Sequence, residues 1–310
     1  MTEKPLTPLT KMPEIPSTPT PIEKTEKVNP LEKYYRQPVI YITLPSKGKY
    51  YSKEVFEPTT TGELPVLPMT AKDEIEFKTP DAMISGQATV NVIQSCIPNI
   101  KDAWQLVNYD LDTVLLGIRI ATYGETMDIS GTIPGVTPTE TINHSLNLPQ
   151  LLETIKNIEI TDTGTTKSGF TIRCKPLDYK KLSDSQISAF EQQKQYATVA
   201  TSKLSDQEKG KSFAQNFAKL TELNFSMLVE AIIEITTPDR QVVSDPDQIK
   251  SFVNNANAKV ISEIQTVLGE IRTQAAIKPL KIKSTDEQIK KGAKATFEMP
   301  ITFDSSNFFV

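Results

Sequence analysis

Histidine and cysteine carry out much of the acid–base, nucleophilic and metal chemistry of proteins near neutral pH, and this sequence of 310 residues contains few of them. His144 is the single histidine, and Cys96 and Cys174 are the two cysteines. These three residues cannot supply the four ligands of an ordinary structural zinc site. We interpret His144 as an ordinary surface or hydrogen-bonded residue of a strand, and the two distant cysteines as buried thiols rather than a disulfide.

Two glycine-containing segments approach the pattern of a phosphate-binding loop, in which backbone N–H groups surround the phosphates and a lysine neutralises them. Residues 164–169 have the glycine spacing, but Phe170 stands at the lysine position. Residues 210–212 read Gly-Lys-Ser, but Ser205 stands where the first glycine belongs. Neither segment is expected to bind a nucleotide, and no Gly-x-Ser-x-Gly nucleophile motif occurs.

Three polar residues, Asn108, Asp110 and Asp112, have the opening spacing of a calcium-binding loop. Thr113 replaces the glycine of that loop, and Arg119 replaces its bidentate acid. We therefore interpret Asp110 as the N-terminal cap of a helix. The sequence predicts no enzyme, no cofactor and no metal ion, although an aspartate-based hydrolase would escape this search.

Composition and charge restrict the possible partners. The formal net charge is −4, whereas proteins that bind nucleic acids usually present a basic face that neutralises phosphates. No apolar run approaches the roughly 20 residues of a membrane-spanning helix. Residues 1–5 lead into prolines rather than an apolar segment, so we expect no secretion signal. These features predict a protein made in a reducing cytoplasm, without nucleic-acid or membrane partners.

The first 38 residues contain eight prolines, and their apolar residues follow no helical or strand period. Such a segment buries too little apolar surface to offset its ordering entropy, so we predict an extended or polyproline-like arm. The arm is either a disordered tail or a segment that contacts other subunits. In the second case its candidate contact residues include Pro5, Pro8, Pro13 and Pro16.

Local patterns predict the elements that follow the arm. Residues 39–44 and 63–68 read as strands, the second an edge strand because of its prolines. Helices are predicted to begin at Thr70 with Asp73 in a capping box, at Thr79-Pro80, and at Asp110, the last ending at Gly124. Residues 142–148 and 169–175 read as strands, and 162–166 lie in the loop before the second.

The second half of the sequence reads as mostly helical. We predict a helix capped by Ser183 with Gln186, a helical stretch to about residue 219, an apolar helix over 225–235, and a helix capped by Asp245. A seam of apolar residues further along requires a partner helix, either internal or in a neighbour; it consists of Ile261, Ile264, Leu268 and Ile271. Alternation over 297–303 then predicts a half-buried strand.

These elements predict an α+β fold: a small mixed or antiparallel sheet with several helices, a helix-rich C-terminal half and an extended proline-rich N-terminal arm. We expect four parts: the arm over 1–38, an α+β core over 39–178, a helical region over 179–275, and a C-terminal strand and aromatic tail over 276–310 that packs back on the core.

Two further segments are candidate partner contacts. The loop from Leu44 to Tyr51 places lysines beside aromatic residues, a mixture common at interfaces, although a tight hairpin with solvated lysines would have the same sequence. Its candidate residues are Leu44, Lys47, Lys49, Tyr50 and Tyr51. The chain also ends in Phe308, Phe309 and Val310, which are either buried in this domain or inserted into a neighbouring subunit.

Two stretches together resemble a known family. The first is Leu-Pro-Ser-Lys-Gly-Lys-Tyr-Tyr at 44–51. The second, within 63–125, contains Pro-Met-Thr-Ala-Lys-Asp-Glu at 68–74, Val-Ile-Gln-Ser-Cys-Ile-Pro at 92–98 and Ile-Arg-Ile-Ala-Thr-Tyr-Gly-Glu at 118–125. This ordered set resembles the baseplate hub subunit family of T-even-type contractile-tailed bacteriophages over about residues 39–125, and again at 300–304 and 307–309.

The sequence departs from that family at one feature. Many similar proteins carry Cys-x-x-Cys pairs after the Tyr-Gly-Glu segment and before the terminal strand, in the manner of a split zinc ribbon. Here those positions read Ser-Gly-Thr-Ile-Pro-Gly at 130–135 and Lys-Gly-Ala-Lys-Ala at 291–295. No ligands remain there. If the two regions meet in space, apolar packing must replace the metal.

The resemblance implies a structural or assembly protein of the phage tail baseplate that bridges neighbouring subunits and carries no cofactor. Its implied partners are other baseplate and tail proteins, with several copies around the tail axis. It would be located in the virion, and in the host cytoplasm during assembly. Two alternatives remain: a transient assembly chaperone absent from the finished particle, and a tail-associated hydrolase of the cell wall.

Overall fold

The computed structural model describes residues 29–79, 86–137, 139–201 and 205–301. The chain divides into two compact units, Met1–Tyr35 and Arg36–Val310. In the first unit the described part contains the short 3-10 helix η1 (Glu32–Tyr34), whose side chains are exposed. The four candidate prolines of the arm, from Pro5 to Pro16, lie outside the described residues.

The first part of the larger unit is a helical layer against a two-stranded sheet. Strands β1 (Ile40–Ile42) and β2 (Leu64–Val66) pair antiparallel, which confirms both predicted strands. Pro65 is tolerated in β2 because that strand has a single neighbour in the sheet. Helix α1 (Ala71–Phe77) starts with the predicted capping box, in which the Thr70 hydroxyl accepts from the Asp73 N–H.

Three further elements complete this layer: α3 (Gln87–Cys96), the 3-10 helix η2 (Ala103–Gln105) and α4 (Asn108–Tyr123). The predicted helix start at Thr79-Pro80 runs into residues 80–85, which lie outside the described residues. Helix α4 is buried on most sides. It ends at Gly124, as predicted, where φ is +97°. Its start was predicted wrongly, since Val107 is the N-cap residue and Asp110 is the third residue of the helix.

Strand β1 crosses α4 at a glycine. A Cβ at Gly117 would lie 3.0 Å from the Ile42 side chain, so the small residue allows the close approach. Helix α5 (Leu148–Lys156) begins at the Asn147 cap and packs on the same core. The largest fully buried side chains of this core are Ile42, Leu44, Leu64, Ile93, Ile97, Ile100, Leu106, Leu116, Ile118 and Leu148.

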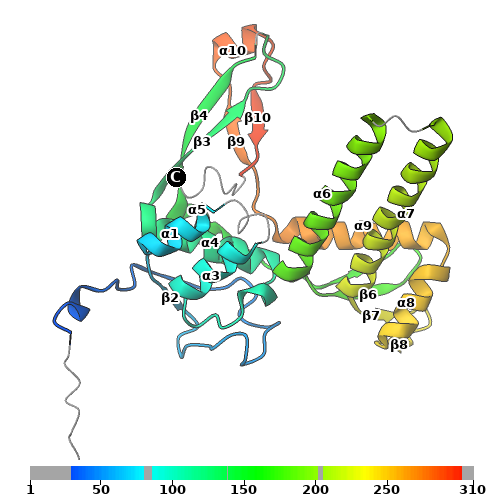
Figure 1. Ribbon diagram of the computed structural model, residues 1–310, viewed down its shortest axis with the longest axis horizontal. Coiled ribbons are helices and arrows are strands. Elements are labelled where there is room, and N and C mark those ends of the chain that lie inside the picture. The colour runs from blue at the N-terminus through cyan, green and yellow to red at the C-terminus, as the bar shows by residue number, and fades with distance from the viewer. Residues whose placement is uncertain (1–28, 80–85, 138, 202–204, 302–310) are drawn as a thin grey trace, which may run out of the picture. The chain divides into compact units, whose positions relative to one another are not determined.

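Two β-hairpins pack against each other through a separate small core (Figure 1). One pairs β3 (Thr126–Thr132) with β4 (Thr141–Asn147), and the other pairs β9 (Leu280–Lys283) with β10 (Thr296–Met299). The short helix α10 (Asp286–Lys290) lies between β9 and β10. The core between the hairpins consists of Ile133, Val136, Ile282, Ala293, Phe297 and Met299.

The turns near residues 130–135 and 291–295, where the resemblance led us to look for cysteine pairs, meet in this structure. A Cβ built on Gly135 would lie 2.7 Å from the carbonyl oxygen of Gly292, and one on Gly292 would lie 2.5 Å from that of Gly135. Both glycines have positive φ, +87° and +106°. The two regions therefore do meet, and apolar packing with glycine-to-glycine contact joins them, as expected for that case.

The remaining part is built on a four-stranded antiparallel sheet of order β5-β6-β7-β8. Its strands are β5 (Thr163–Thr165), β6 (Thr171–Cys174), β7 (Ile232–Thr236) and β8 (Val242–Val243). Two predictions are wrong here. Residues 163–165 form a strand instead of a loop, and the apolar helix over 225–235 ends at Ala231, so that Ile232 and Ile235 lie in β7.

Helices α8 (Pro246–Asn255) and α9 (Ala258–Ala275) contribute to the core of this sheet. Asp245 caps α8 through the N–H groups of Asp247 and Gln248, as predicted. The apolar seam of α9 has an internal partner, because Ile261 and Ile264 are buried in the core that includes Ile172 of β6. The same core also contains Leu228 of α7 and Ile249 and Val253 of α8, so the seam meets helices as well as the sheet.

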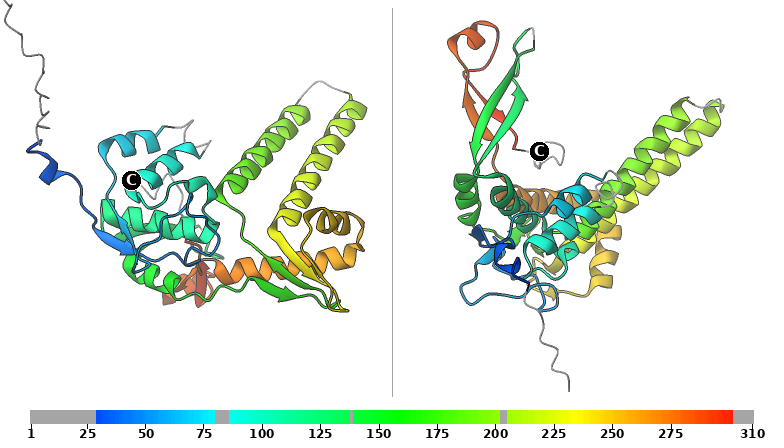
Figure 2. Two further views of the ribbon diagram at one scale, coloured as in Figure 1. Left: turned by 90° about the horizontal axis from the view of Figure 1, so that it is seen from below. Right: turned by 60° about the vertical axis from the view of Figure 1, so that its left-hand side comes forward.

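Helices α6 (Tyr179–Thr201) and α7 (Asp206–Ala231) lie side by side as a long helical hairpin (Figures 1 and 2). The predicted cap at Ser183 is wrong: α6 starts four residues earlier, and the Asp178 carboxylate accepts from the Lys181 N–H at 2.9 Å. Ser183 is buried within the helix. Ser205 and Glu208 form the capping box of α7.

The architecture confirms the α+β class, with small antiparallel sheets and a helix-rich second half. Within the described ranges, no helix is both long and apolar enough to cross a lipid bilayer.

The glycine contact between the hairpin turns can be tested by Gly292→Ala. The added Cβ meets the Gly135 carbonyl at positive φ, so we expect a loss of about 2 kcal/mol or more in the free energy of unfolding. In Gly292→Ala, hydrogen exchange of the backbone amides should accelerate first in β3, β4, β9 and β10. Gly210→Ala is the control, since nothing lies within 4 Å of its added Cβ and α7 should gain about 0.5–1 kcal/mol. Equal stability of the two variants would contradict the proposed contact.

Candidate functional site

A buried carboxylate organises the loop that the sequence singled out. Asp110 is 0% exposed, and its Oδ1 accepts from the Ser46 N–H at 2.9 Å. Its Oδ2 accepts from the Ser46 hydroxyl and, at 2.5 Å, from the Tyr51 hydroxyl. Tyr51 in turn accepts from the Val107 N–H at 3.1 Å. These hydrogen bonds therefore hold the loop against the first turn of α4.

This arrangement accounts for most of the loop sequence. Leu44 is buried in the first core, and Tyr51 packs against the same core. The loop consists of successive turns, in which Gly48 has a φ of +77° and its added Cβ would lie 3.0 Å from the Phe56 ring. Lys47, with φ of +53°, is exposed. Of the five candidate residues, Leu44 and Tyr51 thus make internal contacts.

Lys49 and Tyr50 contact a segment more than a hundred residues away in the sequence. The Lys49 ammonium donates to Asp162 Oδ2 at 2.8 Å, which raises the pKa of Lys49 and lowers that of Asp162. Lys49 also lies 5.6 Å from the centre of the Tyr50 ring, and Tyr50 packs against Tyr109. The lysine side chain is largely exposed, so this ion pair contributes little to the free energy of unfolding. It does connect the loop to the segment that contains Asp162.

The arrangement around Asp110 offers little chemistry. Burial raises the pKa of Asp110, while the hydrogen bonds from Ser46 and Tyr51 act in the opposite direction. Burial also raises the pKa of the thiols, to about 12 for Cys96 and about 11 for Cys174. Both cysteines are free and buried, which confirms the prediction. In the described part of the chain, no three His, Cys, Asp or Glu residues gather as a metal site would require.

A second polar cluster fastens the start of the larger unit. The Arg36 guanidinium donates to Pro68 O at 2.9 Å, to Asp73 Oδ2 at 3.2 Å, and to both oxygens of Ser95 at 2.8 Å. Burial alone would raise the pKa of Asp73, but hydrogen bonds from Thr70 and Ser95 together with Arg36 lower it. Arg36 is therefore held at the start of the larger unit by four hydrogen bonds, a role that no sequence pattern indicated.

The clearest surface for a partner lies on the α6–α7 hairpin, where the sequence predicted helices but no contact residues. Phe190, Tyr196 and Phe217 are 62%, 56% and 73% exposed. Large aromatic side chains are unusual on a free surface and are enriched at protein interfaces. In the sequence, the signal for this surface was the position of these aromatic residues, which fall outside the apolar face of each helix.

The other candidate contacts cannot be placed in the fold. Phe308, Phe309 and Val310 lie outside the described residues, as do the four prolines of the arm. His144 is half-buried in β4, opposite Ile129, as expected of an ordinary residue of a strand.

Removal of the Tyr51 hydroxyl tests the carboxylate cluster. Tyr51→Phe leaves Asp110 with one donor fewer and the Val107 N–H without its acceptor, so we expect a loss of about 1–3 kcal/mol in the free energy of unfolding. Urea denaturation measures this. Tyr41→Phe on the exposed face of β1 is the matched control and should change stability by less than about 0.5 kcal/mol. A neutral Tyr51→Phe would show that the cluster does not hold the loop.

The Asp73 cluster predicts a pH dependence. The pKa of Asp73 is lower in the folded chain than its usual value, so its contribution is present above about pH 4 and is lost as the pH falls. Asp73→Asn should therefore be less stable than the wild type by about 1–3 kcal/mol at pH 7, with the difference shrinking toward pH 3. Denaturation curves at the two pH values measure this, with the exposed Asp128→Asn as control. A difference independent of pH would rule out the carboxylate as its source.

Comparison with known proteins gives one family and no individual relative. No curated protein matches the chain, and no solved structure matches it. The model of the family described as T4 bacteriophage base plate protein matches residues 37–298. This range starts beside Arg36 and includes the loop fastened by Asp110, both hairpins, and the α6–α7 pair. The chain therefore belongs to the T4 bacteriophage base plate protein family and is a structural component of the phage tail baseplate, located in the virion.

Proposed function

We propose that this chain acts at the hub of a contractile tail baseplate, where it bridges neighbouring subunits through protein–protein contacts. Several copies would surround the tail axis, after assembly in the host cytoplasm. The observation that carries the proposal is the α6–α7 hairpin with its exposed aromatic residues. Further contacts in this proposal are the arm before Arg36, the exposed Lys47 and Lys49 with the half-buried Tyr50, and the Phe308–Val310 end.

The hairpin has the dimensions of a bridging element. Its helices contain 23 and 26 residues, which correspond to lengths of about 35–40 Å. Near one end they are joined by the ion pair of Lys181 with Glu230 at 2.6 Å and by the Ser185 hydroxyl, 3.0 Å from the Met227 sulfur. Further along, the rings of Tyr196 and Phe213 pack at a tilt of 32°, with their centres 4.5 Å apart.

The low net charge of the hairpin favours a contact with a partner through apolar side chains of its helices. Acidic and basic residues are nearly balanced over 179–231, so no strong field attracts or repels a partner. Phe190 and Phe217 supply the large apolar side chains that usually contribute most of the affinity when helices dock. An enzyme role has less support, because the serine hydroxyls that meet buried carboxylates, Ser46 at Asp110 and Ser95 at Asp73, serve internal hydrogen bonds of the fold.

The arm suits the same role. Residues before Arg36 are rich in proline, which restricts the unbound chain and lowers the entropic cost of docking on another subunit. Arg36 fixes the point from which the arm extends.

The hairpin proposal is tested by the double variant Phe190→Ser with Phe217→Ser. Both side chains are exposed, so the variant should fold with unchanged stability. Supplied to cells infected by a phage that lacks this chain, it should enter tails at least tenfold less often than the wild type. Quantitative mass spectrometry of purified tails gives the measurement, with the exposed Gln193→Ser and Gln215→Ser as the matched control.

The same measurement separates the alternatives. A chaperone would be missing from tails or far below stoichiometry even as the wild type.

A chain that lacks residues 1–35 keeps Arg36 and should fold, yet be depleted from tails in the same way if the arm is a contact. Normal incorporation of the double hairpin variant would refute the hairpin as the bridging surface. Clearing of cell-wall substrate by the purified chain would support the hydrolase alternative instead.

A further inference from the structure

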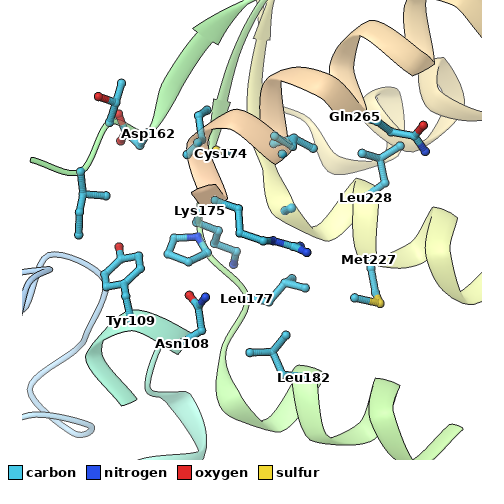
Figure 3. A pocket seen from close by; sticks show the side chains of 18 of the residues that line it. Asn108, Tyr109, Asp162, Cys174, Lys175, Leu177, Leu182, Met227, Leu228 and Gln265 are labelled. Carbon is cyan, nitrogen blue, oxygen red and sulfur yellow. The ribbon is translucent and has the colours of Figure 1, made fainter. Parts of the chain in front are cut away.

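A cavity of about 360 Å³ lies where α6, α7 and α9 meet the start of α4 and the end of β6 (Figure 3). Much of its wall is aliphatic: Leu182 comes from α6, Met227 and Leu228 from α7, and Leu268 from α9. Leu177 joins them from the segment between β6 and α6. At about 30 Å³ for each water molecule in the liquid, the space has room for about a dozen non-hydrogen atoms. Its size therefore suits a small ligand.

Two cations lie on the wall of this cavity. Lys175 follows β6, and Arg272 belongs to the last turn of α9. Neither forms an ion pair among the residues that the structure describes. Asp162 lies on the same wall, but its carboxylate is already paired with Lys49 at 2.8 Å. Charge complementarity therefore favours a ligand that carries a negative charge beside its apolar part.

A buried hydroxyl adds a hydrogen-bond donor to these charges. Tyr109 lines the cavity and is 5% exposed, and its hydroxyl makes no hydrogen bond of normal geometry to any described residue. Burial and the neighbouring Tyr50 raise the pKa of Tyr109, so the hydroxyl keeps its proton. A buried hydroxyl without an acceptor costs free energy, which an anionic oxygen in the cavity would recover. The side-chain amides of Asn108 and Gln265 are further donors on this wall.

The composition of the wall favours an aliphatic tail over an aromatic ring. Its aromatic residues, Tyr50 and Tyr109, pack against each other. The wall therefore presents no two aromatic faces between which a planar ligand could stack. The leucines and Met227 have flexible, aliphatic side chains that adapt to a hydrocarbon chain.

We propose that this cavity binds a medium-chain aliphatic carboxylate, with a chain of about 8–12 carbons. The carboxylate pairs with Lys175 and Arg272 and accepts from the Tyr109 hydroxyl. The hydrocarbon chain packs between Leu182 of α6 and Met227 of α7, near the end of the hairpin where the chain enters and leaves it. The bound ligand thus contacts both helices of the hairpin and α9, and joins them. The site is independent of the proposed bridging surface, because Phe190 and Phe217 do not line the cavity.

Titration calorimetry with the full chain tests the chemistry of the ligand. The probes are hexanoate, octanoate and decanoate, all below the concentrations at which they form micelles, and 1-octanol as the uncharged control. The affinity should rise by about fourfold for each added methylene until the cavity is filled. Octanoate should bind about tenfold more tightly than 1-octanol. Equal affinity of octanoate and 1-octanol, or an affinity that does not change with chain length, would overturn the proposed ligand class.

Variants of the wall test the location of the site. Arg272 is exposed, so Arg272→Glu should fold, and it should weaken decanoate binding about tenfold. Tyr109→Phe removes only the hydroxyl and should weaken binding by roughly five- to tenfold. Lys219→Glu, an exposed charge reversal on α7 that does not line the cavity, is the control and should have no effect. If Arg272→Glu keeps the thermal midpoint and the decanoate affinity of the wild type, the cavity is not the site.

A third measurement identifies the occupant in the assembled particle. Mass spectrometry of an organic extract of purified tails should detect an aliphatic carboxylate in proportion to this chain, and tails built with Arg272→Glu should lack it. Tails without such a carboxylate would overturn the small molecule as occupant and indicate an acidic side chain of a neighbouring subunit instead. The Phe190→Ser and Phe217→Ser variant should bind decanoate as the wild type does, so a failure here remains distinct from a failure of the hairpin proposal.

Discussion

The buried carboxylate of Asp110 is the interaction on which the first part of the fold depends. A carboxylate without exposure loses its hydration and must be compensated by donors in the protein. Ser46 and Tyr51 supply these donors, which means that the loop between β1 and β2 has to return to the first turn of α4. Since α4 also packs against β1 through Gly117, one polar cluster sets the position of the loop, the sheet and the central helix together.

The two β-hairpins are joined by packing alone. Gly135 and Gly292 bring the two turns within backbone contact, and Phe297 and Met299 fill the space behind them. Apolar packing of this kind requires no metal, but it depends on the absence of side chains at both turns. The stability of the joint is therefore concentrated in two glycines rather than in bonds to an ion.

The described polar clusters serve structure, whereas the surfaces left for partners are apolar. Arg36, Asp73 and Asp110 all have their hydrogen bonds satisfied inside the fold. The thiols of Cys96 and Cys174 stay protonated because burial raises their pKa. By contrast, Phe190 and Phe217 expose most of their surface.

The sequence by itself determined the features whose causes are local. The capping box of Thr70 with Asp73, the Asp245 cap and the end of α4 at Gly124 depend on residues within a few positions of one another, and all three were predicted correctly. The strands β1, β2, β4 and β6 were also predicted from short local segments, the first two with prolines beside or within them. The α+β class and the family followed from the order of these elements and motifs.

Only the tertiary structure decided the features that depend on distant partners. Asp110 has the sequence context of a cap, but its donors lie 64 and 59 residues earlier, and these place it within the helix. Ile232 and Ile235 continue a helical pattern, yet pairing with β6 draws them into a strand. Residues 163–165 became β5 for the same reason, because a neighbouring strand supplies the hydrogen bonds that a short polar segment cannot make alone. Local patterns fix which conformations a segment can adopt, and long-range hydrogen bonds and burial select among them.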